Sequence, residues 1–263
     1  MIITNNINSI DKSRFSYALG IYNSENNGNT PSHGKIIGTL GEKSLHAVLK
    51  RYYEPDGSRH EIPVGNYVAD IVNQDGIFEI QTRGLSNLRP KLNELLEFCR
   101  VTVVHPVIVS RRIISMNSET GEIISVRKSP KHGSVYSELR ELYTLREFVT
   151  DGRLTIRLPF LTADEYRAFG IKTNRRKKQR TKNGEYVSDT VPTDIIDEII
   201  LAQPSDYAVL IPAGLPENFG AADFAAAART DPAAARMALN LLVRTGLASR
   251  TGKNGNSIVY KLV

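Results

Sequence analysis

Two carboxylates and a glutamine are grouped around one predicted turn, a combination that could hold a metal ion. Asp70 lies three residues before the polar segment 73–76, Glu79 lies three residues after it, and Gln81 follows. The flanking runs within 67–82 are largely apolar and the segment between them carries turn residues. This pattern predicts a β-hairpin.

The pairing of the two strands decides which side chains meet. If Val72 pairs with Ile77, Asp70 lies opposite Glu79, whereas a two-residue loop would place Asp70 opposite Gln81. Side chains alternate along a strand with a period of two, so all three polar side chains share one face in either register.

The chemistry follows from the apolar setting of these acids. The strands otherwise carry Val68, Ile71, Phe78 and Ile80. A buried pair of carboxylates is unfavourable unless a proton or a cation compensates it. Mg²⁺ or Mn²⁺ prefers such oxygen ligands, so the sequence predicts a divalent metal site. The alternative is a surface hairpin with ordinary solvated acids.

The elements around the hairpin predict how it is held. Apolar positions 45, 48, 49 and 52 have helical spacing, as do those of residues 85–99, and residues 60–64 and 101–109 have strand character. A second hairpin is expected over 113–126, a helix over 136–149 and a strand over 154–161, with a new helix starting at 162–165. The first three strands have no helices between them, which predicts a mixed α/β layer rather than a doubly wound sheet.

This order of residues and elements resembles the core of the PD-(D/E)XK, or restriction endonuclease-like, nuclease superfamily. The matching features over about 38–110 are Glu42 on a helix, Asp70, Glu79-Ile80-Gln81 on the next strand, and then a helix and a strand. The resemblance implies a restriction endonuclease-like mixed sheet flanked by helices. It also implies metal-assisted phosphodiester hydrolysis, with Asp70, Glu79, the main-chain carbonyl of Ile80 and Glu42 around Mg²⁺ (or Mn²⁺). Residues 76–83 and 127–133 also resemble a bacterial family of uncharacterised proteins.

Two positions depart from the superfamily pattern. Gln81 takes the place of the usual lysine, and Ala69 stands where the hallmark proline would be. Lysine would bring a positive charge to the scissile phosphate, whereas glutamine brings only hydrogen bonds. We expect Lys43 or Arg83 to supply that charge. The alternative is a nuclease-like protein that binds or regulates DNA without cleaving it.

Positive charge is concentrated in one run. Residues 172–182 contain seven Lys or Arg and no acid, whereas residues 183–220 contain seven acids and no Lys or Arg. The run could neutralise phosphates or could be a solvated linker. The predicted nucleic-acid contacts are Lys43, Arg83, Arg127, Lys128, Lys131, Arg175, Arg176, Lys177, Lys178, Arg180, Arg236, Arg244, Arg250 and Lys253.

The C-terminal residues resemble a winged-helix domain. We predict helices over 193–202 and 223–229, a third helix with Asp231 as its N-cap and Pro232 in its first turn, and a hairpin over 248–262. Such a domain would dock on duplex DNA, with little base reading because the third helix begins with alanines. The alternative is a winged helix that binds protein, in a subunit of a larger assembly.

The sequence therefore predicts a four-part chain. Residues 1–35 are expected to be poorly ordered, 36–171 to form the nuclease-like domain, 172–192 a basic linker and 193–263 the winged helix. The single cysteine excludes an internal disulfide and predicts a reducing cytoplasm. No apolar run is long enough for a membrane helix. A homodimer is plausible because a cleaver of duplex DNA usually needs two sites.

Overall fold

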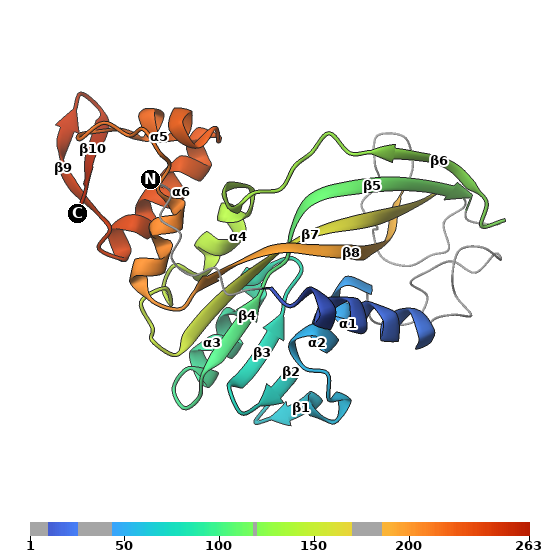
Figure 1. Cartoon of the computed structure of the whole chain (residues 1–263). Coiled ribbons are helices and arrows are strands. Elements are labelled where there is room, and N and C mark those ends of the chain that lie inside the picture. The colour runs from blue at the N-terminus through green and yellow to red at the C-terminus, as the bar shows by residue number, and fades with distance from the viewer. Residues whose placement is uncertain (1–9, 26–43, 118–119, 170–185) are drawn as a thin grey trace.

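The structure, a computed structural model, describes residues 10–25, 44–117, 120–169 and 186–263 (Figure 1). The helices are α1 (Lys12–Glu25), α2 (Ser44–Tyr53), α3 (Arg89–Leu95), α4 (Leu139–Leu142), α5 (Ala221–Ala228) and α6 (Pro232–Arg244). The strands are β1 (His60–Val64), β2 (Tyr67–Asn73), β3 (Gly76–Ile80), β4 (Val101–Val104), β5 (Val107–Asn117), β6 (Ile123–Lys128), β7 (Leu154–Phe169), β8 (Tyr186–Leu201), β9 (Ala248–Asn254) and β10 (Ser257–Leu262). Short 3₁₀ helices include η3 (Leu85–Leu88), η4 (Val135–Glu138), η5 (Tyr143–Leu145) and η6 (Pro204–Leu210).

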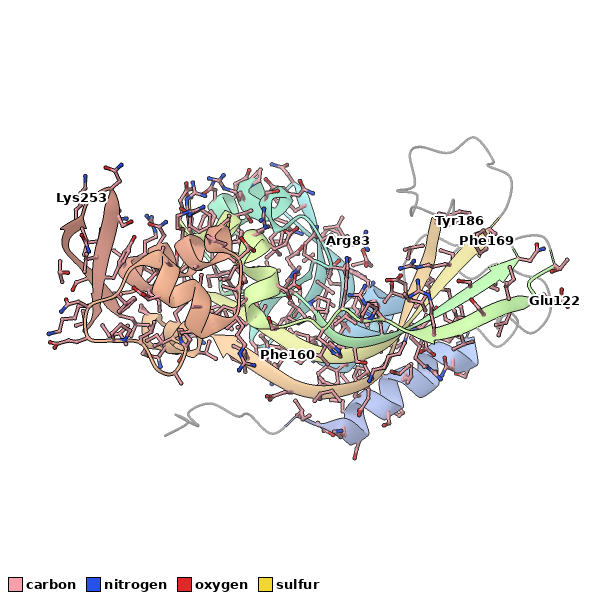
Figure 2. The ribbon with its side chains drawn as sticks, turned by 90° about the horizontal axis from the view of Figure 1, so that it is seen from above. Arg83, Glu122, Phe160, Phe169, Tyr186 and Lys253 are labelled. Atoms are coloured by element: carbon pink, nitrogen blue, oxygen red, sulfur yellow. The ribbon has the colours of Figure 1, made fainter. Side chains whose placement is uncertain are left out.

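A mixed sheet organises the molecule, which confirms the predicted α/β class. Its strand order is β1-β2-β3-β4-β7-β5-β6, and β8 pairs with β7. The pairs β1–β2 and β2–β3 are antiparallel, whereas β3–β4 and β4–β7 are parallel. The long ribbon of β7 and β8 continues beyond β4, where β5 and β6 extend the sheet and α1 runs alongside β8 (Figures 1 and 2).

Helices cover both faces of the short strands. On one face, Leu92 and Leu95 of α3 belong to the same core as Ile77 of β3. On the other face, Leu49 of α2 belongs to the same core as Phe78. Neighbouring residues of a strand point to opposite faces, so β3 is held between these two helices.

The C-terminal elements share the larger of the two cores. The buried leucines of α6 and Phe224 of α5 lie in the same cluster as Leu92 of α3. As predicted, Asp231 caps α6, accepting hydrogen bonds from the N–H groups of Ala233 and Ala234 at 2.9 and 3.1 Å. The predicted hairpin is also confirmed, as β9 and β10.

The predicted helix over 193–202 is wrong, because these residues form the end of β8. The helix start at 162–165 is likewise wrong, since β7 continues through Phe169. Residues 186–192, predicted as linker, also belong to β8. The sheet decides the outcome, because β8 pairs with β7 from Ala168↔Tyr186 to Ile156↔Leu201.

Other corrections concern α1 and two predicted elements that are interrupted in the structure. Lys12–Glu25, predicted to be poorly ordered, forms α1, whose Phe15 and Ala18 are buried against α2. The strand over 101–109 is divided into β4 and β5 at His105 and Pro106, and the helix over 136–149 is divided into short turns. Among the described residues, no helix is both long and apolar enough to cross a membrane.

The strand assignment of β8 can be tested with neighbouring isoleucines. Ile195 is fully buried opposite Leu161, whereas Ile196 is 45% exposed. We expect Ile195→Ala to lower the free energy of unfolding by about 2–5 kcal/mol and Ile196→Ala to change it by no more than about 0.5 kcal/mol, measured by urea denaturation. Equal losses in the two variants would contradict this assignment.

Candidate functional site

The predicted hairpin is present, with Val72 opposite Ile77. Its turn contains only two unpaired residues, because Asn73 also pairs with Gly76. We expected a two-residue loop to place Asp70 opposite Gln81. This expectation is wrong, because the two-residue turn keeps the register in which Val72 pairs with Ile77. The register ends at Ile71↔Phe78, so the expected pairing of Asp70 with Glu79 across the strands is not formed.

The two strands part at the acids. Hydrogen-bonded pairs alternate in an antiparallel ladder, so after Ile71↔Phe78 the next bonded pair would be Ala69 and Ile80. The N–H of Ile80 instead donates to Asp70 Oδ2 at 2.7 Å. The carboxylate thus takes the place of a main-chain partner, which fixes its position at the point where β2 leaves β3.

Asp70 is further held by α2. His46 Nε2 lies 3.1 Å from Asp70 Oδ2, and the side chains of these two residues are 21% and 19% exposed. Burial favours the neutral acid, but the hydrogen bonds from His46 and the Ile80 N–H, with the nearby Lys50 charge, outweigh it. The pKa of Asp70 is therefore lower than usual, and the group is ionised at neutral pH.

Glu79 is buried more deeply and is paired with a lysine. Its Oε1 lies 2.5 Å from Lys91 Nζ. Burial raises the pKa of Glu79 and the Asp70 charge adds to the rise, whereas the Lys91 ammonium and a hydrogen bond from the Asp70 main chain oppose it. The neighbouring acids therefore have pKa values shifted in opposite directions, a pattern common where acids do chemistry.

Lys91 is the functional residue that sequence reasoning missed. It lies on α3, its side chain is 11% exposed, and Nζ also donates to the carbonyl of Val68 at 2.7 Å. Its position next to the apolar stripe of Leu88, Leu92 and Leu95 was the available signal. The structure thus brings a lysine to the acids from a helix rather than from β3.

Gln81 makes contacts on both its side chain and its main chain. The side-chain nitrogen of Gln81 donates to the main-chain carbonyl of Arg83. The main-chain carbonyl of Gln81 lies 2.6 Å from His105 Nδ1. His105 is buried and contacts Glu138 at 3.2 Å through Nε2. Gln81 is therefore part of a network beside the acids.

The residues present fit a divalent cation in part. Asp70 and Glu79 are carboxylate oxygen donors in a partly buried site, and Ile80 adds a main-chain carbonyl on β3. Within the described residues, no group of three or more His, Cys, Asp or Glu forms a metal cluster. Glu42, the other predicted ligand, lies outside the described residues.

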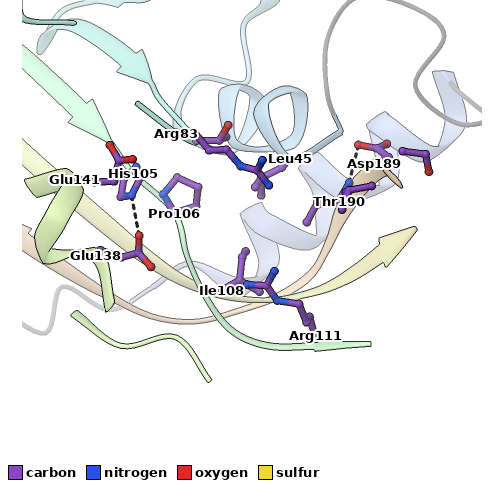
Figure 3. A pocket seen from close by; sticks show the side chains of 13 residues that line it. Leu45, Arg83, His105, Pro106, Ile108, Arg111, Glu138, Glu141, Asp189 and Thr190 are labelled. Atoms are coloured by element: carbon purple, nitrogen blue, oxygen red, sulfur yellow. Dashed lines mark hydrogen bonds and ion pairs between the residues drawn. The ribbon is translucent and has the colours of Figure 1, made fainter. Parts of the chain in front are cut away.

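The predicted nucleic-acid contacts are spread over several elements. Arg83 lines a pocket of about 250 Å³ beyond β3 and β4, together with His105, Arg111 and Glu138 (Figure 3). Arg127, Lys128 and Lys131 are exposed on or after β6, and Arg236, Arg244, Arg250 and Lys253 are exposed on α6, β9 and the hairpin. Lys43, Arg175, Arg176, Lys177, Lys178 and Arg180 lie outside the described residues.

The pairing of Lys91 with Glu79 can be tested through stability. Lys91→Met should lower the free energy of unfolding by about 3–5 kcal/mol, because it leaves a buried carboxylate unpaired. The double variant Lys91→Met/Glu79→Gln should recover most of that loss. Lys261→Met removes the exposed partner of Glu217 and should cost no more than about 1 kcal/mol. A double variant no more stable than Lys91→Met would argue against the pair.

Comparisons with known proteins identify the family of the chain. The family model for the domain of unknown function DUF8091 matches residues 43–202, which run from α2 to the end of β8 and include Asp70, Glu79 and Lys91. A protein from Treponema pallidum (strain Nichols), described as uncharacterised, is 34% identical over 229 residues, which cover 86% of this chain and 87% of that relative. No solved structure gives a significant match. The chain therefore belongs to the DUF8091 family.

Proposed function

We propose that this protein is a metal-dependent nuclease that hydrolyses phosphodiester bonds in nucleic acid, with duplex DNA as its substrate. The observation that carries the proposal is the pair of acids at the parting of β2 and β3. Asp70 is ionised there, and Glu79 is buried beside it and paired with Lys91. The chain order α2, β1, β2, β3, α3, β4, with these strands adjacent in the sheet in the order β1-β2-β3-β4, supports the resemblance to a PD-(D/E)XK core.

Each residue near the acids has its own role in the proposed reaction. Asp70, Glu79 and the carbonyl of Ile80 would hold Mg²⁺ or Mn²⁺, with Glu42 preceding α2. The bound cation would lower the pKa of water and stabilise charge on the phosphate. Lys91 holds a fixed positive charge at Glu79, which Gln81 cannot do. His46 and the Ile80 N–H orient Asp70.

The C-terminal elements support a winged-helix role in binding. α5, α6 and the β9–β10 hairpin follow one another, and Phe219 bridges to Tyr260 of β10. Arg236, Asn240 and Arg244 recur every four residues, so they share one side of α6. Exposed arginines on a helix suit phosphate contacts, which position DNA without reading its sequence.

A second candidate is a DNA-binding or regulatory protein that does not cleave. Gln81 in the place of the usual lysine favours it, and Lys91 favours the nuclease. Docking to a protein partner through an apolar face of α6 has less support, because Leu239, Leu241 and Leu242 of that helix are fully buried in the chain's own core.

Cleavage of supercoiled plasmid tests the proposed reaction. We expect nicking in the presence of Mg²⁺ or Mn²⁺, and a loss of at least about a hundredfold in Asp70→Asn, Glu79→Gln and Lys91→Gln. Lys91→Arg should retain part of the activity, and Gln81→Ala most of it. Cleavage that survives both carboxylate changes would refute the site, and full activity in Lys91→Gln would remove the lysine from it.

Calorimetric titration with Mn²⁺ separates the two candidate functions. The wild type should bind Mn²⁺ and Asp70→Ala should not, whereas Glu217→Gln, a change at an exposed acid, should bind normally. Mn²⁺ at about a hundred times its dissociation constant should stabilise the wild type by about 2.7 kcal/mol in thermal unfolding. A wild type that binds no Mn²⁺ would favour the non-cleaving DNA-binding protein.

A further inference from the structure

A second pocket lies where the C-terminal helices meet the helical turns of the sheet-bearing part. It has a volume of about 500 Å³. Tyr143 and Arg146 line it from η5 and the residue that follows, and Asn240, Arg244 and Arg250 line it from α6 and β9. α6 packs against α4 and η5 (Figure 1), so both walls are fixed relative to each other.

The charged lining of this pocket is made of arginines. Arg146, Arg244 and Arg250 contribute to it, and no acid among the described residues does. The Arg146 guanidinium lies 4.9 Å from the centroid of the Tyr143 ring, and Arg250 Nη2 donates to Asn240 Oδ1 at 3.0 Å. Neutral groups thus orient two of the arginines, leaving a concave surface with an excess of positive charge.

One exposed carboxylate connects this pocket with the candidate metal site. Glu147 Oε1 lies 3.7 Å from Arg146 Nη2, and its Oε2 lies 2.5 Å from Arg89 Nη2. A single acid shared by two arginines leaves net positive charge. Arg89 is the first residue of α3, the helix that carries Lys91 to Glu79. The start of α3 therefore lies close to the pocket, and the same helix contacts the acids through Lys91.

We propose that this pocket binds a phosphate of the nucleic-acid backbone and so places the substrate across α3 and α6. The inference rests on the proposed function, because it names a contact for that same substrate. Guanidinium groups bind phosphate oxygens through paired, geometrically fixed hydrogen bonds. Three guanidinium groups from two parts of the chain make a site for a phosphate held at a fixed place relative to the acids.

The experiment measures binding of a fluorescein-labelled DNA duplex by anisotropy in EDTA, at salt concentrations from about 50 to 200 mM. Log affinity should fall linearly with log salt. The slope should become shallower by about one for each arginine that contacts a phosphate, in Arg146→Gln and in Arg250→Gln, and further in the double variant. Arg59→Gln, an exposed arginine on another element, is the matched control and should leave the slope unchanged.

The outcomes separate this pocket from the catalytic proposal. Unchanged slopes in variants whose thermal unfolding is normal would overturn the inference, as would a wild type that binds no duplex. Arginine-dependent binding of inorganic pyrophosphate without an altered duplex slope would assign the pocket to free polyphosphate and also overturn it. Arginine-dependent slopes without cleavage in Mg²⁺ support the pocket and reject the nuclease. Cleavage in Mg²⁺ with unchanged slopes supports the nuclease and rejects the pocket as a phosphate site.

Discussion

The charge of Glu79 is the constraint on which the site depends. Two other buried acids, Glu165 and Glu198, each accept hydrogen bonds from guanidinium groups, and buried Asp189 accepts them from Ser44 and Thr190. Glu79 is paired with a lysine and has a second acid, Asp70, beside it. Removing one partner of a buried ion pair is costly to stability, so the charge of Glu79 ties the position of Lys91 to that of the acids.

The separation of β2 from β3 at Asp70 explains how side chains of both α2 and α3 contact the two acids. A closed ladder would give the Ile80 N–H to a main-chain carbonyl and would turn Asp70 into an ordinary strand residue. Because Asp70 takes that N–H, α2 can contribute His46 while α3 contributes Lys91. The local strand pairing therefore sets the geometry of the whole group.

Sequence patterns could predict the two acids but not Lys91, the cationic side chain that pairs with Glu79. The hairpin and its register depend on turn chemistry and alternation, both local, so the sequence could predict that Val72 pairs with Ile77 and that Asp70 and Glu79 lie near the same turn. Lys91 lies on a different element, and its reach depends on how α3 lies across the sheet. The spacing of Ile195, Ile196 and Ile199 also fits a helix, and only pairing with β7 along its length makes this segment a strand.

The pairing of β8 with β7 changes the interpretation of the basic run at residues 172–182. As a linker between a nuclease-like domain and a winged helix, residues 172–182 would have tethered two bodies. The run instead connects β7 to the antiparallel β8, between Phe169 and Tyr186, which lie at the end of the molecule opposite Lys253 (Figure 2). The C-terminal elements are joined to the sheet by a continuous hydrophobic core rather than by this run. Cationic side chains on α3 and α6 are therefore fixed relative to Glu79 by packing.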